Sequence, residues 1–204
     1  MAEVWMTEDE IQDLELQADK LRDRLIIQLG AYSGMRIGEI VNLQVSDLNQ
    51  DTVDGELRYF AKVEGKKTDQ EAEGKTETKT RDAWITQDTW KDLQTHINQE
   101  NLTNDDYIMN SRYGGKIHKD SARKIVKRIA EKAYEQTEKE KFLDVSSHDL
   151  RRFFAHHLAE EKGVNIRVVM DLGGWEDLQT FVRHYLDKPS KMTKAQELDN
   201  AGWS

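Results

Sequence analysis

Residues 146–185 read SSHDLRRFFAHHLAEEKGVNIRVVMDLGGWEDLQTFVRHY, and the interpretation of the whole chain starts from this stretch. It places His148 and Arg151 near a predicted helix start, a Gly-Gly-Trp turn at 173–175, and Tyr185 one helix later. Guanidinium groups bind phosphate through fixed N–H donors, a tyrosine hydroxyl can attack phosphorus, and histidine or tryptophan N–H groups can donate to phosphate oxygens. This combination of residue types indicates phosphodiester chemistry.

The length and composition set outer limits on the class of protein. With 204 residues the chain can bury a sizeable core, and we find no internal repeat or flexible linker, so one domain over residues 1–204 is predicted. The absence of cysteine excludes disulfides and thiolate metal sites. No apolar run approaches ~18 residues and no signal-peptide pattern is present, so we expect a cytoplasmic protein without a membrane span.

The charge distribution is uneven along the chain. The net charge is −9, which by itself disfavours nucleic acid as a partner. Between residues 116 and 128, however, six basic residues stand against one acid. On the predicted helix through this region, we expect Lys124, Lys127 and Arg128 to contact DNA phosphates; the alternative is a solvated helix face.

The hydrophobic pattern predicts an α+β fold, mostly α-helical with a small antiparallel β-sheet of about three strands. Thr7 and Glu10 form a capping box before a helical repeat of apolar residues. Asp54-Gly55 is a hairpin signal, and residues 57–63 alternate as a strand does. Residues 64–80 contain almost no apolar side chain and are predicted to be a long loop, after which residues 81–85 resume a strand.

Several helices are predicted in the second half of the chain. Asp120 or Ser121 is expected to cap the basic helix, and Gly163 to end the helix that holds His148. A later helix carries an i, i+3, i+4, i+7 apolar stripe formed by Leu178, Phe181, Val182 and Tyr185.

Three ordered segments carry a family resemblance. SGMRIGEIVNLQVSDL at 33–48, HDLRRFFAHHL at 148–158, and LGGW at 172–175 followed by RHY at 183–185 resemble the catalytic domain of the tyrosine recombinases, the phage-integrase family, and most of all its archaeal members. The resemblance covers residues 7–185. It implies the catalytic-domain fold of DNA breaking-rejoining enzymes and site-specific recombination through a covalent 3′-phosphotyrosyl intermediate. It also implies double-stranded DNA as partner, a homotetramer on that DNA, and no cofactor.

The resemblance also assigns catalytic roles to individual residues. Arg36 matches the first catalytic arginine, and His148 and Arg151 match the histidine and the second arginine. Trp175 stands where the family has histidine or tryptophan. An arginine pair can stabilise charge on the nonbridging oxygens, and the histidine can transfer a proton, whereas an indole can only donate or pack.

The family's nucleophilic tyrosine and its catalytic lysine match positions of this sequence less directly. In many members the tyrosine follows the His/Trp position by nine residues, which here is His184, whereas Tyr185 is the tenth; Tyr185 is nevertheless the assigned nucleophile. The alternative is a purely structural role for its ring. The lysine that protonates the leaving oxygen is assigned to Lys66, with Lys67 and Lys75 as alternatives.

Other readings remain open at this point. Arg152 is predicted to contact a phosphate or to be solvated. The pair His156 and His157 lacks an H-E-x-x-H pattern, so no metal site is predicted. A type IB topoisomerase and a DNA-binding module without catalysis are the alternative functions. Because the resemblance begins by Thr7, the N-terminal DNA-clamping domain of the family is expected to be absent.

Overall fold

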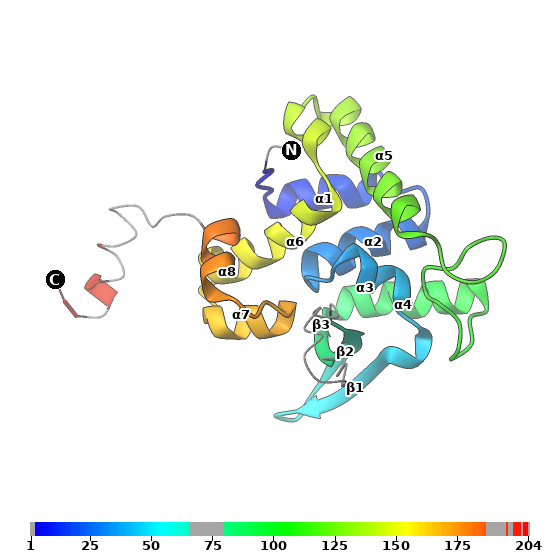
Figure 1. The fold of residues 1–204 in the computed structure, drawn as a ribbon, viewed down its shortest axis with the longest axis horizontal. Helices are drawn as coiled ribbons and strands as arrows, with labels where there is room; N and C mark the ends of the chain where they lie inside the picture. The colour runs from blue at the N-terminus through cyan, green and yellow to red at the C-terminus, as the bar shows by residue number, and fades with distance from the viewer. Residues whose placement is uncertain (1–2, 66–79, 187–194, 196–197, 201, 204) are drawn as a thin grey trace, which may run out of the picture.

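The computed structural model describes residues 3–65, 80–186, 195, 198–200 and 202–203. The elements in chain order are α1 (Glu8–Leu16), α2 (Leu21–Tyr32), α3 (Ile37–Asn42), η1 (Val45–Asp47), β1 (Leu48–Val53), β2 (Glu56–Glu64), β3 (Thr80–Ile85), α4 (Gln87–Glu100), α5 (Lys119–Thr137), η2 (Glu140–Asp144), α6 (Ser147–His156), η3 (His157–Glu161), α7 (Ile166–Gly173) and α8 (Leu178–Tyr185). The sheet lies to one side of a helical body (Figure 1).

The three strands form one antiparallel sheet in the order β1-β2-β3. Asp54 and Gly55 both have positive φ, 52° and 77°, as a tight hairpin turn between twisted strands requires. Ala61 in β2 pairs with Leu48 in β1 and with Ala83 in β3. The predicted α+β class, the hairpin and both later strands are therefore confirmed.

The central element of the helical body is α2. It packs against α1, α3, α4, α5 and α6, which surround it (Figure 1). Its residues Leu25, Ile26, Ile27 and Leu29 are all fully buried. Each such side chain contributes roughly 1.5–3 kcal/mol relative to exposure. Helix α1 is held in this body with the predicted capping box, Thr7 with Glu10, in place.

None of the described helices combines the length and the apolar composition that crossing a membrane requires.

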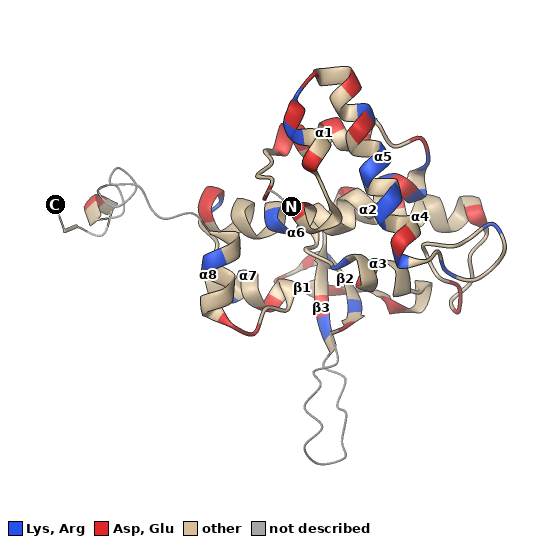
Figure 2. Cartoon of the chain, turned by 45° about the horizontal axis from the view of Figure 1, so that its top comes forward, with Lys and Arg blue, Asp and Glu red and all other residues tan. Residues whose placement is uncertain are grey.

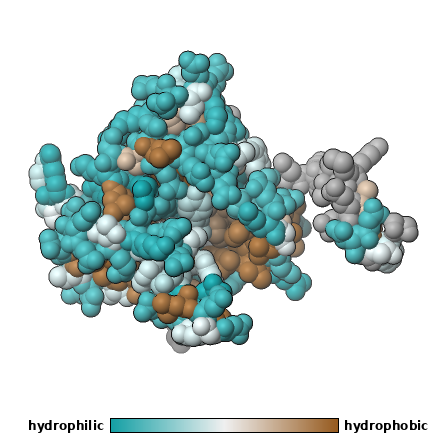
Figure 3. Space-filling model, turned by 180° about the vertical axis from the view of Figure 1, so that it is seen from behind, coloured by the Kyte–Doolittle hydropathy of each residue, from teal (hydrophilic) through white to brown (hydrophobic). Residues whose placement is uncertain are grey.

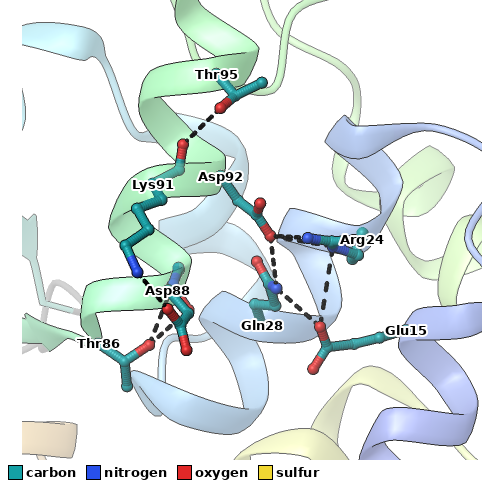
Figure 4. Close-up of polar contacts among 9 residues, drawn as sticks. Glu15, Arg24, Gln28, Thr86, Asp88, Lys91, Asp92 and Thr95 are labelled. Carbon is teal, nitrogen blue, oxygen red and sulfur yellow. Dashed lines mark hydrogen bonds and ion pairs between the residues drawn. The ribbon is translucent and has the colours of Figure 1, made fainter.

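A polar cluster joins α1, α2 and α4 on the side of α2 shown in Figure 4. The amide nitrogen of Gln28 donates to Glu15 at 2.8 Å and to Asp92 at 2.9 Å. Arg24 pairs with the same Asp92 carboxylate. Two carboxylates from different helices thus share donors on α2, which offsets their partial desolvation and fixes the relative positions of the three helices.

Helix α5 begins earlier than predicted. It starts at Lys119 with His118 as its N-cap, so neither Asp120 nor Ser121 caps it. Asp120 instead lies in the first turn, where a carboxylate is favourable, and pairs with Arg123 at 2.7 Å. Basic and acidic residues alternate along the ribbon of α5 and its neighbours (Figure 2).

Helix α6 ends before the predicted Gly163. It stops at His156, and a π-helical turn, η3, follows. His157 Nδ1 lies 2.7 Å from Glu161 Oε2 across this turn. Gly163, with φ of 66°, comes two residues after the turn. The sequence signal therefore marked the end of the helical segment and not the change of helix type inside it.

The predicted apolar stripe on α8 is buried only in part. Phe181 and Tyr185 are buried, but Leu178 and Val182 are 52% and 44% exposed. An apolar patch is visible on the α7–α8 side of the molecule (Figure 3). Two of the four stripe residues therefore lie in the core and two face solvent, because helix α6 covers only one side of this short helix.

Gly34 joins α2 to α3 in a conformation that other residues rarely adopt. Its φ is 60°, and a Cβ atom built on it would lie 2.5 Å from Phe154 Cδ1. Its carbonyl accepts a hydrogen bond from Arg151. The loop therefore packs directly on α6, and only a residue without a side chain fits there.

Gly34→Ala is expected to lower the free energy of unfolding by about 2–5 kcal/mol, since left-handed strain and overpacking add. Gly55→Ala is the matched control, because its φ is also positive but no atom lies within 4 Å of the built Cβ. The control should lose only about 1–2 kcal/mol. Chemical denaturation measures both, and equal losses would contradict the close packing of Gly34 on α6.

Candidate active site

Three of the functional side chains predicted from the sequence line an open cleft of about 950 Å³. Its lining comes from α3, the ends of β2 and β3, α5 and the start of α6. Arg36, His148 and Arg151 all line it, although 112 residues of sequence separate the first two. Lys62, Lys119 and Arg123 add further positive charge to the same lining.

Arg36 is held at the N-terminus of α3 by a carboxylate one turn along the helix. Its Nη1 donates to Glu39 Oε1 at 2.8 Å, and its backbone N–H donates to Glu39 Oε2 at 2.7 Å. Its Nη2 donates to the Gly174 carbonyl at 3.0 Å. Arg36 and Glu39 thus form an i, i+3 ion pair at the start of α3. The Gly174 contact ties the first arginine to the Gly-Gly-Trp turn.

Arg151 is a buried cation at the floor of the cleft, with 2% of the residue exposed. Its Nη1 donates to the Gly34 carbonyl, and its Cζ lies 3.6 Å from the centre of the Trp175 ring. Its Nη2 is buried and has no hydrogen-bond partner among the described residues. Burial lowers the pKa of Arg151 to about 9, with the charge of Arg36 acting in the same direction, so the group remains a cation at neutral pH.

The Gly-Gly-Trp turn brings the indole over this guanidinium. A Cβ on Gly173 would lie 1.8 Å from Trp175 Cζ3, so the ring can fold back only over a glycine. The ring also contacts Phe181 and Tyr185 edge-on, with centroids 5.0 and 4.8 Å apart. Trp175 therefore packs at the junction of α6, α7 and α8 and presents its π face to Arg151.

Tyr185 reaches the same site from α8. It is 6% exposed, stacks on Phe181 at 5.6 Å, and its hydroxyl lies 3.1 Å from His148 Nε2. Desolvation lowers the pKa of His148, and the positive charges of Arg152 and Arg151 lower it further. A neutral imidazole with its proton on Nδ1 can accept the hydroxyl proton through Nε2.

The neighbouring His184, which stands at the ninth position after Trp175, points elsewhere. Its side chain is 47% exposed and its Nδ1 lies 3.7 Å from Glu3. The turn of α8 thus directs the tenth residue, not the ninth, toward His148. Asp177, between Trp175 and the helix, forms the N-cap of α8.

Arg81 is a site residue that sequence reasoning missed. Its Nη2 donates to Glu39 Oε2 at 2.8 Å, so one carboxylate joins it to Arg36. Its side chain, 12% exposed, packs against Gly174. Desolvation lowers its pKa, and Glu39 opposes that change. A basic residue in a strand directly after the charged segment 64–80 gave no signal of burial.

Arg152, predicted to contact a phosphate, does not fit that role. Only 4% of the residue is exposed, and its guanidinium forms an ion pair with Asp149. Its Nε also donates to the carbonyl of His184 at 3.4 Å. Adjacent arginines on one helix point in different directions, so Arg151 faces the cleft and Arg152 faces α8.

The basic residues of α5 divide between two faces. Lys119 and Arg123 line the cleft, whereas Lys124 is exposed and is not part of the lining. Lys127 donates to the Leu143 carbonyl, and Arg128 pairs at 2.8 Å with Asp23, whose side chain is only 1% exposed. The face that the sequence suggested for DNA therefore lies beside the cleft, and two of its three cations have protein partners.

The lysine candidates Lys66, Lys67 and Lys75 lie outside the described residues. Among the residues that the structure does describe, no group of three or more histidine or carboxylate side chains could hold a metal ion. The described site thus offers arginines, one histidine, one tryptophan and one tyrosine.

Known proteins resemble this chain in sequence. The chain is similar to the tyrosine recombinase XerA of Pyrococcus horikoshii, with 28% identity over 178 residues, 86% of this chain and 54% of that protein. It is similar to a tyrosine recombinase of Pseudothermotoga lettingae, with 32% identity over 172 residues, 84% of this chain and 52% of that protein. The chain therefore spans about half the length of these curated relatives.

Solved structures share the fold. A crystal structure of XerA recombinase matches with a TM-score of 0.71 at 22% identity, covering 97% of this chain and 65% of that one. XerH recombinase bound to its difH substrate matches with a TM-score of 0.70 at 21% identity, covering 97% and 53%. Residues 4–192 match the phage integrase family as a whole. The chain belongs to the phage integrase family.

Proposed function

We propose that this chain cleaves and rejoins DNA strands as a site-specific tyrosine recombinase, with Tyr185 as nucleophile. The observation that carries the proposal is the Tyr185 hydroxyl, 3.1 Å from His148 Nε2, beside a buried arginine whose Nη2 has no partner in the described part of the chain. A phosphate oxygen is the kind of acceptor that completes such a donor set.

The proposed cleavage step is a transesterification, in which one phosphate ester replaces another. The Tyr185 oxygen forms a bond to phosphorus while the bond to the 5′-oxygen breaks, and His148 takes the phenolic proton. Arg36 and Arg151 donate to the nonbridging oxygens, where negative charge grows; one such preorganised donor is worth ~2.7–4 kcal/mol. The 3′-phosphotyrosyl bond retains the energy of the broken ester, so rejoining needs no nucleotide cofactor.

The leaving 5′-oxygen needs a proton, which the family resemblance assigns to Lys66, with Lys67 and Lys75 as alternatives. Residues 62–65 and 80, which flank this segment, line the cleft next to Arg36. The described residues on both sides of the segment therefore face the proposed phosphate site. The same lysine, once neutral, can accept the proton back when the 5′-hydroxyl attacks the phosphotyrosine.

Double-stranded DNA is the proposed substrate, bound by a homotetramer. Each chain offers one Tyr185, and each cut strand occupies one tyrosine covalently. Exchange between two duplexes involves four strands and so needs four chains. The cleft lining is basic on the α5 side, through Lys119 and Arg123, which suits a phosphate backbone although the net charge of the chain is −9.

Tyr185→Phe should abolish the covalent protein–DNA complex, because phenylalanine has no nucleophilic oxygen. Folding should change by no more than about 0.5–1.5 kcal/mol, the value of one hydrogen bond, since the ring keeps its contacts with Trp175 and Phe181. The measurement is trapping on a nicked suicide duplex, followed by mass spectrometry of the linked peptide. Tyr134→Phe and His184→Ala are controls that should keep the adduct.

The outcome also separates the alternative functions. No adduct in the unsubstituted chain, with DNA binding intact, would favour a DNA-binding module without catalysis. An adduct with relaxation of supercoiled DNA but no strand exchange between duplexes would favour a type IB topoisomerase. An adduct on a residue other than Tyr185 would refute the assigned nucleophile.

The cleavage rate should fall in acid with an apparent pKa below that of an ordinary histidine, because burial and the nearby arginines lower the pKa of His148. Above its lowered pKa His148 is neutral and can accept the Tyr185 proton; as the pH falls through that pKa the ring gains a proton and loses its acceptor. Single-turnover rates on saturating DNA measure this limb. In His148→Gln, which cannot titrate, the residual rate should be flat over the same range. An identical acidic limb in that variant would exclude His148 as the base.

DNA affinity should depend on the cleft-facing side of α5. Replacing Lys119 and Arg123 together by alanine should flatten the plot of log affinity against log salt by about 1.8, or ~0.9 per contact. Replacing Lys124 and Lys127 together removes the same charge outside the cleft and should leave the slope nearly unchanged. The reverse result would return the DNA-binding face to the residues that the sequence suggested.

A further inference from the structure

Arg152 is a buried cation that the proposed chemistry does not use. Its side chain is 5% exposed, and burying a guanidinium costs several kcal/mol unless charged partners surround it. The partners are present: Asp149, itself 4% exposed, forms an ion pair with Nη1, and Glu3 lies 3.3 Å from Nη2. The remaining donor, Nε, is directed at a backbone carbonyl of another helix.

That carbonyl belongs to His184, in the last turn of α8. The final carbonyls of a helix have no partner within the helix and carry the negative end of its dipole, so a cation there is stabilising. One peptide bond separates this carbonyl from the Cα atom of Tyr185. Arg152 is therefore in contact with the backbone from which the proposed nucleophile extends.

The other end of this link is fixed to α6. Asp149 accepts the backbone N–H of Ser146 at 2.9 Å and its hydroxyl at 2.6 Å, which forms the cap of α6. It also accepts the N–H of Val4 at 3.1 Å. The Arg152 guanidinium thus has a defined place relative to the helix start that carries His148 and Arg151.

We propose that Arg152 is a positioning residue that joins α6 to the last turn of α8 and so keeps the Tyr185 hydroxyl against His148. This inference rests on the proposed function. It assigns Arg152 no contact with DNA: the side chain acts through the His184 carbonyl. Without the Arg152 contact, Phe181 and the Tyr185 ring still hold α8 in the core, but the position of the Tyr185 hydroxyl relative to His148 Nε2 is no longer fixed.

Arg152→Lys is the variant that tests this most directly. Lysine keeps the charge opposite Asp149, so the buried carboxylate stays paired, but a single ammonium cannot serve both Asp149 and the His184 carbonyl in the manner of a planar guanidinium. Arg22→Lys is the matched control. Arg22 likewise contacts a carboxylate, Asp23, and a backbone carbonyl, that of Asn110 at 2.9 Å, but it contacts no residue of the proposed site.

Three quantities are measured on a suicide duplex and on the free protein: the single-turnover rate of covalent complex formation on saturating DNA, the Kd for DNA, and the hydrogen exchange of residues 178–186. In Arg152→Lys the rate should fall on the order of 10- to 100-fold, since a small displacement of a reacting group costs that much. The Kd should stay unchanged, and exchange should rise in α8 alone. Arg22→Lys should change none of the three.

A cleavage rate and α8 exchange equal to those of the unsubstituted chain would overturn the inference, as would equal slowing in Arg22→Lys. If Arg152→Lys does not fold, the double variant Asp149→Asn with Arg152→Gln removes the buried charge pair together; cleavage at the normal rate in that variant overturns the inference, and slowed cleavage with normal Kd supports it. Failure of the proposed function is a separate result: no covalent complex in the unsubstituted chain.

Discussion

The site depends on a buried positive charge, the guanidinium of Arg151. A cation out of water costs several kcal/mol unless it is neutralised, and its described partners are a carbonyl and an aromatic ring, not a carboxylate. A desolvated cation–π contact returns about 2 kcal/mol, so the compensation is incomplete. An anion entering the cleft would complete it. We therefore read the open donor of Arg151 as a preorganised phosphate contact that needs little rearrangement when the substrate binds.

The surrounding elements follow from that constraint. Gly34 must lack a side chain so that its carbonyl can approach Arg151. Gly173 must lack one so that the Trp175 ring can fold back and cover the Arg151 guanidinium. Glu39 lies between Arg36 and Arg81 and pairs with both, which leaves the cluster of these three arginines and one carboxylate with a net charge of +2. This excess is suited to a phosphate whose negative charge grows during the reaction.

Helix caps and alternating hydrophobicity are local signals, and they predicted the helices and the hairpin. The ordered motifs singled out the set formed by Arg36, His148, Arg151, Trp175 and Tyr185. Sequence reasoning failed where the decisive fact was which side of a helix meets which neighbour. Helical periodicity separates apolar from polar residues but does not rank polar residues among themselves. The sequence analysis therefore chose Lys124 and not Lys119, although only Lys119 lines the cleft.

The burial of two arginine side chains was also not predicted from the sequence. Arg81 was predicted only as the start of a strand, and Arg152 as a phosphate contact or a solvated side chain. Arginine is seldom buried unless paired, and the partners Glu39 and Asp149 are recognised as such only in three dimensions. The register of Tyr185 was likewise undecidable from spacing alone. The position of the Asp177 cap sets the rotation of α8, and with it which residue faces His148.

The most direct measurement is a crystal structure of Tyr185→Phe bound to an uncleaved duplex. The proposed site requires a scissile phosphate with one nonbridging oxygen within hydrogen-bond distance of Arg151 Nη2 and another near the Arg36 guanidinium. The edge of the residue 185 ring should then face phosphorus opposite the leaving 5′-oxygen. A phosphate bound elsewhere on the protein, with Arg151 Nη2 still lacking an acceptor, would contradict it.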